Sequence, residues 1–153
     1  MYPMPDGRTM IDRCAKGQVF STLDIKAGFH NVRLTEYTKR CCGLVTQRGL
    51  YWWLRLEFGL VGAPAFFQYI MDSELAGEVD VDAYLDDCSC AGADWKACWQ
   101  CTLRSMRKLA DIGLMLNMRK SHFLVDDFGL LGFRACDGYF SMAEKMLRGW
   151  ADL

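Results

Sequence analysis

Two adjacent aspartates, Asp86 and Asp87, constrain the fold of this chain more than any other feature of its sequence. An alternating run, Val79–Ala83, precedes them, and a short apolar run, Cys88–Ala91, follows them. Two such runs around a short polar segment are typical of a β-hairpin. Because neighbouring carboxylates repel each other, a bound divalent cation would favour this turn, and Mg²⁺ prefers carboxylate oxygens. The pattern also fits an ordinary surface turn, in which Asp is a common residue.

Length and composition indicate a single globular domain. A chain of 153 residues, 52% of them hydrophobic, is long enough to bury a core. Charged residues interrupt every apolar run before it reaches bilayer length, and no signal peptide is visible. The net charge of −1 argues against binding nucleic acid through bulk positive charge, so any such binding has to be local. We therefore expect an intracellular protein, cytoplasmic or nuclear, with no membrane partner.

The eight cysteines are expected to be reduced thiols. Cys98 and Cys101 form a C-x-x-C pair, but they fall in a strongly helical segment, and no second pair stands at zinc-site spacing. A large core without a secretory signal also disfavours a disulfide framework. The pair is best interpreted as small residues on an apolar helix face, with a zinc site as the alternative.

The first half of the chain is rich in predicted strands. A strand is expected over Val19–Ile25, with Asp24 near its end, and a polar loop over Thr35–Arg40. Two further strands, Cys41–Thr46 and Leu50–Leu56, are predicted to form a hairpin with a glycine in its turn.

Two amphipathic helices are predicted after these strands. A loop with two glycines and a proline, Phe58–Pro64, leads into a helix expected over Ala65–Ala76. Asp94 is the expected N-cap of a long helix over Trp95–Ile112. The remaining predicted elements are short strands at Leu114–Leu116, His122–Val125 and Gly129–Phe133, and a last helix starting near Met142.

This order of elements predicts an α+β fold in which two helices pack on one face of an antiparallel sheet. In such a layout Asp24 ends the first strand, and Asp86 sits at the turn of a later strand that could lie beside it. The pattern allows the two carboxylates to meet but does not require it.

Ordered motifs along the chain resemble those of the palm region of reverse transcriptases, closest to the polymerases of gypsy-type LTR retrotransposons and retroviruses. The stretch Phe20–His30 is similar to the first catalytic motif, and Gly49–Leu54 followed by Phe58–Gln68 to the second. The third motif corresponds to Tyr84–Asp87, the fourth to Gly113–Asn117 with Lys120, and the start of the fifth, the primer grip, to Leu131–Phe133. The resemblance implies a polymerase palm with a partial fingers hairpin.

The same resemblance implies a two-metal mechanism of nucleotidyl transfer from a dNTP to a primer, with Mg²⁺ as the cofactor and Mn²⁺ as a possible substitute. Asp24 and Asp86 are expected to bridge the metals, the carbonyl of Ile25 to complete one shell, and Asp87 to contribute less. Lys120 matches a lysine that protonates the departing pyrophosphate as a general acid, with a solvated surface lysine as the alternative. The implied catalytic residues are thus Asp24, Asp86, Asp87 and Lys120.

Further residues are assigned to the substrates by resemblance. Phe29 matches an aromatic residue that contacts the nucleotide sugar, with a core aromatic as the alternative. Phe58 and Gly59 begin the loop that is expected to line the nucleotide. The expected contacts with the template or primer are Gln68, Tyr84, Leu131 and Gly132. The implied partners are an RNA or DNA template–primer and dNTPs.

Departures from the family pattern leave the activity of this chain open. We expect residues 1–153 to be a single palm-centred domain that lacks most of the fingers and the thumb, and that needs those segments, an RNase H segment or a partner protein. Glu57 stands where proline is usual, and Gly62 where asparagine is usual. The chain is predicted to be a reverse transcriptase fragment of a retroelement polyprotein. The alternative is a decayed or domesticated domain without catalysis that acts as a structural or binding module.

Overall fold

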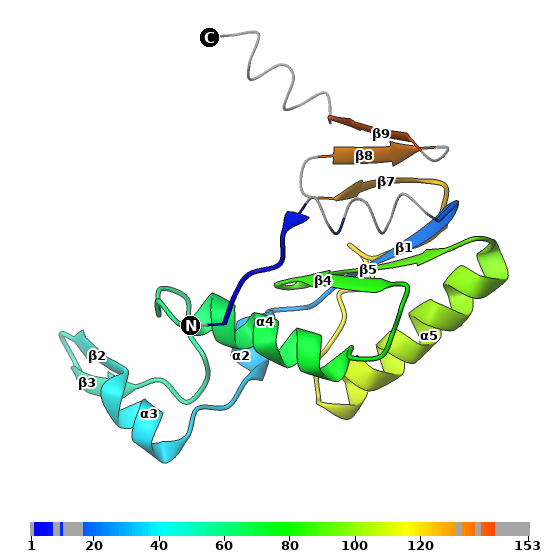
Figure 1. The fold of residues 1–153 in the computed structure, drawn as a ribbon. Coiled ribbons are helices and arrows are strands. Elements are labelled where there is room, and N and C mark those ends of the chain that lie inside the picture. The colour runs from blue at the N-terminus through cyan, green and yellow to red at the C-terminus, as the bar shows by residue number, and fades with distance from the viewer. Residues whose placement is uncertain (1, 8–9, 11–16, 131–132, 137–138, 143–153) are drawn as a thin grey trace, which may run out of the picture.

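A four-stranded antiparallel sheet forms the centre of the protein (Figure 1). The structure is a computed structural model that describes residues 2–7, 10, 17–130, 133–136 and 139–142. The strand order is β4-β5-β1-β6, with β1 at Val19–Asp24, β4 at Val81–Tyr84, β5 at Asp87–Gly92 and β6 at His122–Val125. Strand β1 therefore lies in the interior of the sheet, directly beside β5, which forms a hairpin with β4 around Asp86.

Two helices cover one face of this sheet, as the sequence predicts. Helix α4 spans Ala63–Glu74 and α5 spans Trp95–Asp111 (Figure 1). Asp94 caps α5 as expected, because its Oδ1 accepts a hydrogen bond of 2.7 Å from the Ala97 amide. One hydrophobic core joins both helices to the sheet, and its central members are Leu23, Phe67, Met71, Val81, Cys88, Cys90, Cys101 and Leu109. Each larger apolar side chain that is fully buried contributes roughly 1.5–3 kcal/mol.

A close approach fixes where α5 crosses the sheet. A Cβ atom at Gly92, the last residue of β5, would overlap the backbone nitrogen of Cys98 in the first turns of α5. Glycine is therefore required here for the helix to rest on the strand. Cys98 and Cys101 face the core as buried free thiols, in agreement with the apolar-face interpretation.

A second, two-stranded sheet projects from this body (Figure 1). Its strands are β2, Gly43–Thr46, and β3, Gly49–Trp52, and all eight residues are exposed. Two short helices, α2 at Gly28–Asn31 and α3 at Glu36–Cys41, connect it to β1. The expected hairpin is confirmed, but its strands are shorter than the predicted Cys41–Thr46 and Leu50–Leu56.

The polar loop predicted over Thr35–Arg40 is wrong, because this segment begins α3. The Thr35 hydroxyl accepts a hydrogen bond of 3.2 Å from the Thr38 amide and so caps the helix. An ion pair between Lys39 and Glu36, three residues apart, supports the single exposed turn. Capping residues and charge spacing thus outweigh the lack of an apolar face in this segment.

The C-terminal part of the described chain forms a third sheet. Its strands are β7 at Asp127–Leu130, β8 at Phe133–Cys136 and β9 at Tyr139–Met142, in that order. The strand predicted at Leu114–Leu116 is reduced to one isolated bridge between Ile25 and Leu116. The helix predicted from Met142 onward lies outside the described residues. Among the helices that the structure describes, none is both long and apolar enough to cross a bilayer.

Candidate active site

The antiparallel register of β1 and β5 brings three carboxylates to one edge of the central sheet. Asp24, the last residue of β1, lies directly opposite Asp87, the first residue of β5. Asp87 also pairs with Tyr84, so Leu85 and Asp86 form a two-residue hairpin loop. The amide of Ile25 donates a hydrogen bond of 2.9 Å to the Asp86 carbonyl and ties this loop to the end of β1.

A third segment, residues 117–121, carries Lys120 and is hydrogen-bonded to the backbone of Asp24. The amide of Asn117 donates to the Asp24 carbonyl at 2.8 Å, and the Asp24 amide donates to the Ser121 hydroxyl at 3.2 Å. Lys120 Nζ then lies 3.9 Å from Asp24 Oδ1. The lysine side chain is 70% exposed and the aspartate 26%, so the amine has more room to move than the carboxylate.

The negative charges at this edge are not fully compensated. Partial burial of its carboxyl and the charges of Asp86 and Asp24 raise the pKa of Asp87, and Lys120 offsets only part of this effect. The cluster therefore attracts a cation. A carboxyl group whose pKa is raised by burial and by neighbouring carboxylates is also a feature of functional sites.

The donor set suits a hard divalent cation that is shared with a ligand. Within the described residues, no three His, Cys, Asp or Glu side chains are grouped so that they alone could hold a metal ion. Mg²⁺ is commonly held by one or two carboxylates together with phosphate oxygens and water, rather than by an all-protein cage. The uncompensated charge around Asp87 and the oxygen-only donors at this edge fit that mode of binding.

The hairpin loop has an unusual backbone conformation. Leu85 has a φ of +54°, and Asp86 is not among the residues with positive φ. This is the φ pattern of a type II′ turn, in which glycine is the usual first central residue. A left-handed conformation costs a residue with a Cβ atom about 1–2 kcal/mol. The surrounding structure must supply contacts that hold Leu85 in place.

Gln68 supplies such contacts from helix α4, and this differs from the expected contact with a template strand. Its side chain is fully buried, at 0% exposure. Its Oε1 accepts a hydrogen bond of 2.8 Å from the Leu85 amide, and its Nε2 donates to the Ala83 carbonyl at 2.8 Å. Nε2 also donates to Asp72 Oδ1 at 2.8 Å. Sequence reasoning missed this role, for which the spacing of Gln68 and Asp72 by one helical turn is the only local signal.

The aromatic residues assigned to the nucleotide differ in their burial. Phe29 is 9% exposed and belongs to the core, where its ring lies 5.3 Å from that of Phe67 and 5.1 Å from that of Phe58. Phe58 is 60% exposed and forms the outer member of this stack. Gly59, the next residue, has a φ of +89°, which explains why glycine is found there.

The Glu57 carboxylate lies next to the His30 imidazole in the structure. The two groups lie 3.3 Å apart, and the imidazole in turn packs against Phe58 at 5.2 Å between ring centroids. A protonated His30 would offset the negative charge that the sequence places beside this loop.

The remaining assigned residues are distributed as follows. Tyr84 is half-buried at the end of β4, beside the carboxylates, and Ile25 is buried directly after Asp24. Leu131 and Gly132 lie outside the described residues.

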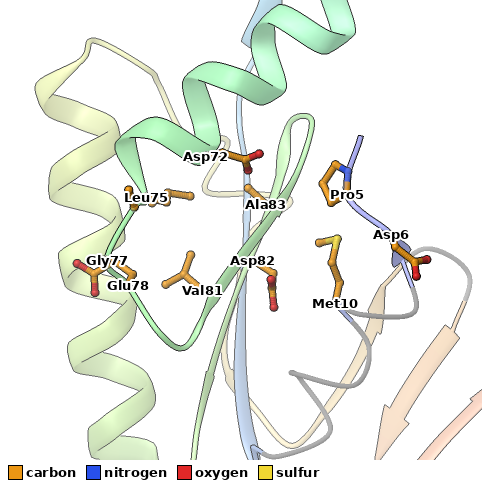
Figure 2. Close-up of a pocket in the computed structure, with 11 residues that line it drawn as sticks. Pro5, Asp6, Met10, Asp72, Leu75, Gly77, Glu78, Val81, Asp82 and Ala83 are labelled. Atoms are coloured by element: carbon orange, nitrogen blue, oxygen red, sulfur yellow. The ribbon is translucent and has the colours of Figure 1, made fainter. Parts of the chain in front are cut away.

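A cavity of about 360 Å³ lies away from the carboxylate edge (Figure 2). Its lining comes from the N-terminal segment, the end of α4 and strand β4, with Pro5, Met10, Asp72, Leu75, Val81 and Asp82 among its residues. Asp72 both lines this cavity and accepts a hydrogen bond from Gln68. Asp24, Asp86 and Asp87 are not part of the lining.

Comparison with known proteins gives consistent matches. A family model described as reverse transcriptase (RNA-dependent DNA polymerase) matches residues 1–135. The retrovirus-related Pol polyprotein from transposon opus of Drosophila melanogaster is 32% identical over 134 residues, which cover 86% of this chain and 13% of the polyprotein. The Pol polyprotein from transposon gypsy of the same organism is 28% identical over 148 residues, 95% of this chain and 14% of the polyprotein. The chain therefore spans about one seventh of the length of these relatives.

Solved structures share the fold. The foamy viral protease-reverse transcriptase in complex with dsDNA superposes with a TM-score of 0.84 at 16% identity, over 100% of this chain and 33% of that one. The same kind of protein in complex with an RNA/DNA hybrid gives a TM-score of 0.80 at 18% identity, over 88% of this chain and 18% of that one. These similarities confirm the predicted α+β palm architecture.

Proposed function

The chain belongs to the reverse transcriptase family, and from this premise we propose that it is the palm of an RNA-directed DNA polymerase within a retroelement polyprotein. The observation that carries the proposal is the meeting of Asp24, Asp86 and Asp87 at one sheet edge, with Lys120 beside them. Its substrates are a primed RNA or DNA template and dNTPs. The activity belongs to the chain together with whatever further segments its longer relatives contribute.

Asp24 and Asp86 hold the divalent metal in this proposal, with the Ile25 carbonyl as an additional oxygen donor and Asp87 as the weaker ligand. Reverse transcriptases use divalent metal ions in general, and Mg²⁺, or Mn²⁺ in its place, would neutralise charge on the reacting phosphate here. Asp24 is suited to a fixed ligand because hydrogen bonds from Asn117 and to Ser121 hold its backbone. Asp86 is suited to the same task because its carbonyl is tied to Ile25.

Lys120 is the proposed general acid. Its exposed amine stands 3.9 Å from Asp24 Oδ1, which keeps a proton donor at the carboxylate edge. A flexible lysine can reach a departing pyrophosphate oxygen and deliver its proton there. The loose contact with Asp24 favours this role over a structural ion pair, because weak exposed pairs contribute little to stability.

Phe58 and Gly59 are proposed to line the incoming nucleotide, since an exposed ring and an open glycine stand on the loop before α4. Phe29 packs against Phe58 with ring centroids 5.1 Å apart, and its proposed role is contact with the nucleotide sugar. Tyr84, and the residues Leu131 and Gly132, are proposed to contact the template or primer end.

The test is dNTP incorporation on a primed RNA template with Mg²⁺ or Mn²⁺, measured with the chain joined to the further segments that its longer relatives contribute. Asp86→Asn should reduce the rate at least about 100-fold, since removing one charged group that stabilises a transition state costs about that factor. Asp126→Asn is the matched control, because Asp126 is an exposed residue between β6 and β7 outside the carboxylate cluster. Equal rates in wild type and Asp86→Asn, or no incorporation by either, would refute the proposal for this chain.

A further inference from the structure

Gln68 connects helix α4 to the backbone on both sides of residue 84. Its amide oxygen accepts from the Leu85 amide, and its amide nitrogen donates to the Ala83 carbonyl, each at 2.8 Å. Both partners belong to the backbone of the hairpin formed by β4 and β5, which carries Asp86 and Asp87 and is called the carboxylate hairpin below. The side chain is completely buried, so water cannot replace these hydrogen bonds.

The residue that Gln68 holds is the one with the strained conformation. Leu85 has a φ of +54° at a position where hairpins usually carry glycine. Leu85 directly precedes Asp86 and Asp87 in the chain. A release of the Leu85 amide would let the loop relax and would move both carboxylates relative to Asp24.

A second pair of hydrogen bonds fixes the orientation of the Gln68 amide. Asp72 Oδ1 accepts from Gln68 Nε2 at 2.8 Å, and Asp72 Oδ2 accepts from the Tyr2 hydroxyl at 2.7 Å. Figure 2 shows Asp72 on α4 next to Ala83 of β4, close to the N-terminal segment that carries Pro5. The ring of Tyr2 also packs edge-on against Tyr69, with centroids 5.4 Å apart. The N-terminal segment is thereby linked to the carboxylate hairpin through two side chains.

We propose that Gln68 is a positioning residue for the carboxylates: oriented by Asp72 and Tyr2, it keeps Leu85 left-handed and so sets the distance of Asp86 and Asp87 from Asp24. Its effect on catalysis rests on the proposed polymerase function. Its effect on the geometry of the hairpin does not.

The first test measures amide hydrogen exchange in the chain with Gln68→Leu, which keeps a side chain of similar size and removes all three hydrogen bonds. Exchange at Leu85–Asp87 should rise at least about tenfold, because one lost hydrogen bond of typical strength corresponds to roughly that factor. Thr102→Val is the matched control, since it removes a buried hydrogen bond of 2.7 Å to the Cys98 carbonyl within α5. A rise of the same size in both variants, or none in Gln68→Leu, would overturn the proposal.

The second test is rescue by glycine. Leu85→Gly accepts a positive φ without strain, so the hairpin of Gln68→Leu/Leu85→Gly should regain most of the exchange protection at Asp86 and Asp87. A purely structural role of Gln68 in the core predicts additive effects and no rescue. Additive effects therefore count against the proposal.

Mn²⁺ binding to the chain, followed by electron paramagnetic resonance, gives a readout independent of turnover. Gln68→Leu should weaken this binding several-fold, and in an active enzyme it should lower kcat with little change in KM for the dNTP. If wild type binds Mn²⁺ and loses affinity in Gln68→Leu but incorporates no dNTP, the polymerase proposal fails and the positioning role stands. Unchanged affinity overturns the positioning role.

Asp72→Ala covers the case in which Gln68→Leu does not fold. This variant leaves both hydrogen bonds between Gln68 and the hairpin in place. It removes only the Asp72 carboxylate, which accepts hydrogen bonds from Gln68 and Tyr2. Exchange at Leu85–Asp87 should rise by a smaller factor, about threefold, because roughly half of a typical hydrogen-bond contribution is lost there. No rise in this variant contradicts the proposed orientation by Asp72.

Discussion

Removing one negative charge from the carboxylate edge is expected to stabilise the protein while it weakens metal binding. Asp87→Asn keeps the size of the side chain and removes its charge. In the folded chain, burial and the charges of Asp86 and Asp24 raise the pKa of Asp87 above its ordinary value of 3.8. The folded state therefore binds this proton more tightly than the unfolded state does. Stability falls as the pH rises through the interval just above 3.8, and it stays lowered at neutral pH.

The expected gain is modest because the site lies at the surface. Asp87 is exposed at the rim of the sheet, where solvent screens its interaction with Asp86 and Asp24. Charge interactions at such positions contribute about 0.2–1 kcal/mol, and Lys120 cancels part of the repulsion. We expect Asp87→Asn to raise the free energy of unfolding by less than about 1 kcal/mol at pH 7, and by close to nothing near pH 3, where wild-type Asp87 is mostly protonated.

The assay is urea unfolding followed by tryptophan fluorescence, for which the chain has five tryptophans. Wild type, Asp87→Asn and Asp126→Asn are compared at pH 7 and near pH 3, without divalent cations. Sodium chloride at about 1 M should shrink the difference at pH 7, because the Debye length falls to about 3 Å. The reasoning is refuted if Asp87→Asn is less stable than wild type at pH 7, or if its effect is the same at both pH values.

Adding millimolar Mg²⁺ to the same assay completes the test. A cation that binds only the folded state raises its stability by an amount set by the ratio of its concentration to its dissociation constant. Wild type should gain more from Mg²⁺ than Asp87→Asn does, so the difference between them shrinks or reverses. Equal gains in both proteins would show that Asp87 has no part in holding the metal.

Two further substitutions test the packing that supports the site. Glu78→Gln should lower the free energy of unfolding by about 1 kcal/mol at pH 7, because hydrogen bonds from Arg104 and Lys108 lower the pKa of Glu78 below its ordinary value. That contribution is fully present above the ordinary pKa of Glu78, 4.5, and is lost as the pH falls through its lowered pKa. The difference between the two proteins in urea unfolding should therefore shrink as the pH falls below 4.5. Gly92→Ala should cost at least about 2 kcal/mol, because its Cβ would overlap the Cys98 backbone, which cannot rotate away. Unfolding within about 0.5 kcal/mol of wild type would contradict this packing.

Much of the fold was predictable because local patterns and packing agree in it. The apolar face of α5, its Asp94 cap and the β-rich run of β1 gave elements whose ends differ from the predicted ones by one residue. The Thr35–Arg40 segment was mispredicted because capping and an ion pair, rather than apolar periodicity, stabilise its single turn. The two strands predicted for the exposed β2–β3 hairpin were also longer than the observed strands, because the apolar residues there are not buried.

The site was predictable in its residue types and less so in its contacts. Asp24, Asp86, Asp87 and Lys120 come together in the structure, but their roles in binding and catalysis stay predictions. Gln68 was assigned to the template because helix position alone does not reveal which way a polar side chain points. In the structure it is buried and turned toward the hairpin.

The sequence by itself determined the first strand, the two long helices, the presence of a hairpin around the adjacent aspartates and the acidic residues at its turn, because these depend on local periodicity and turn chemistry. Only the tertiary structure decided that Asp24 faces Asp87, that Lys120 approaches Asp24, and that Gln68 holds Leu85 in a left-handed conformation. These contacts join residues far apart in the chain. They depend on the register of β1 against β5 and on side-chain direction, which are settled by the pairing and packing of segments far apart in the chain.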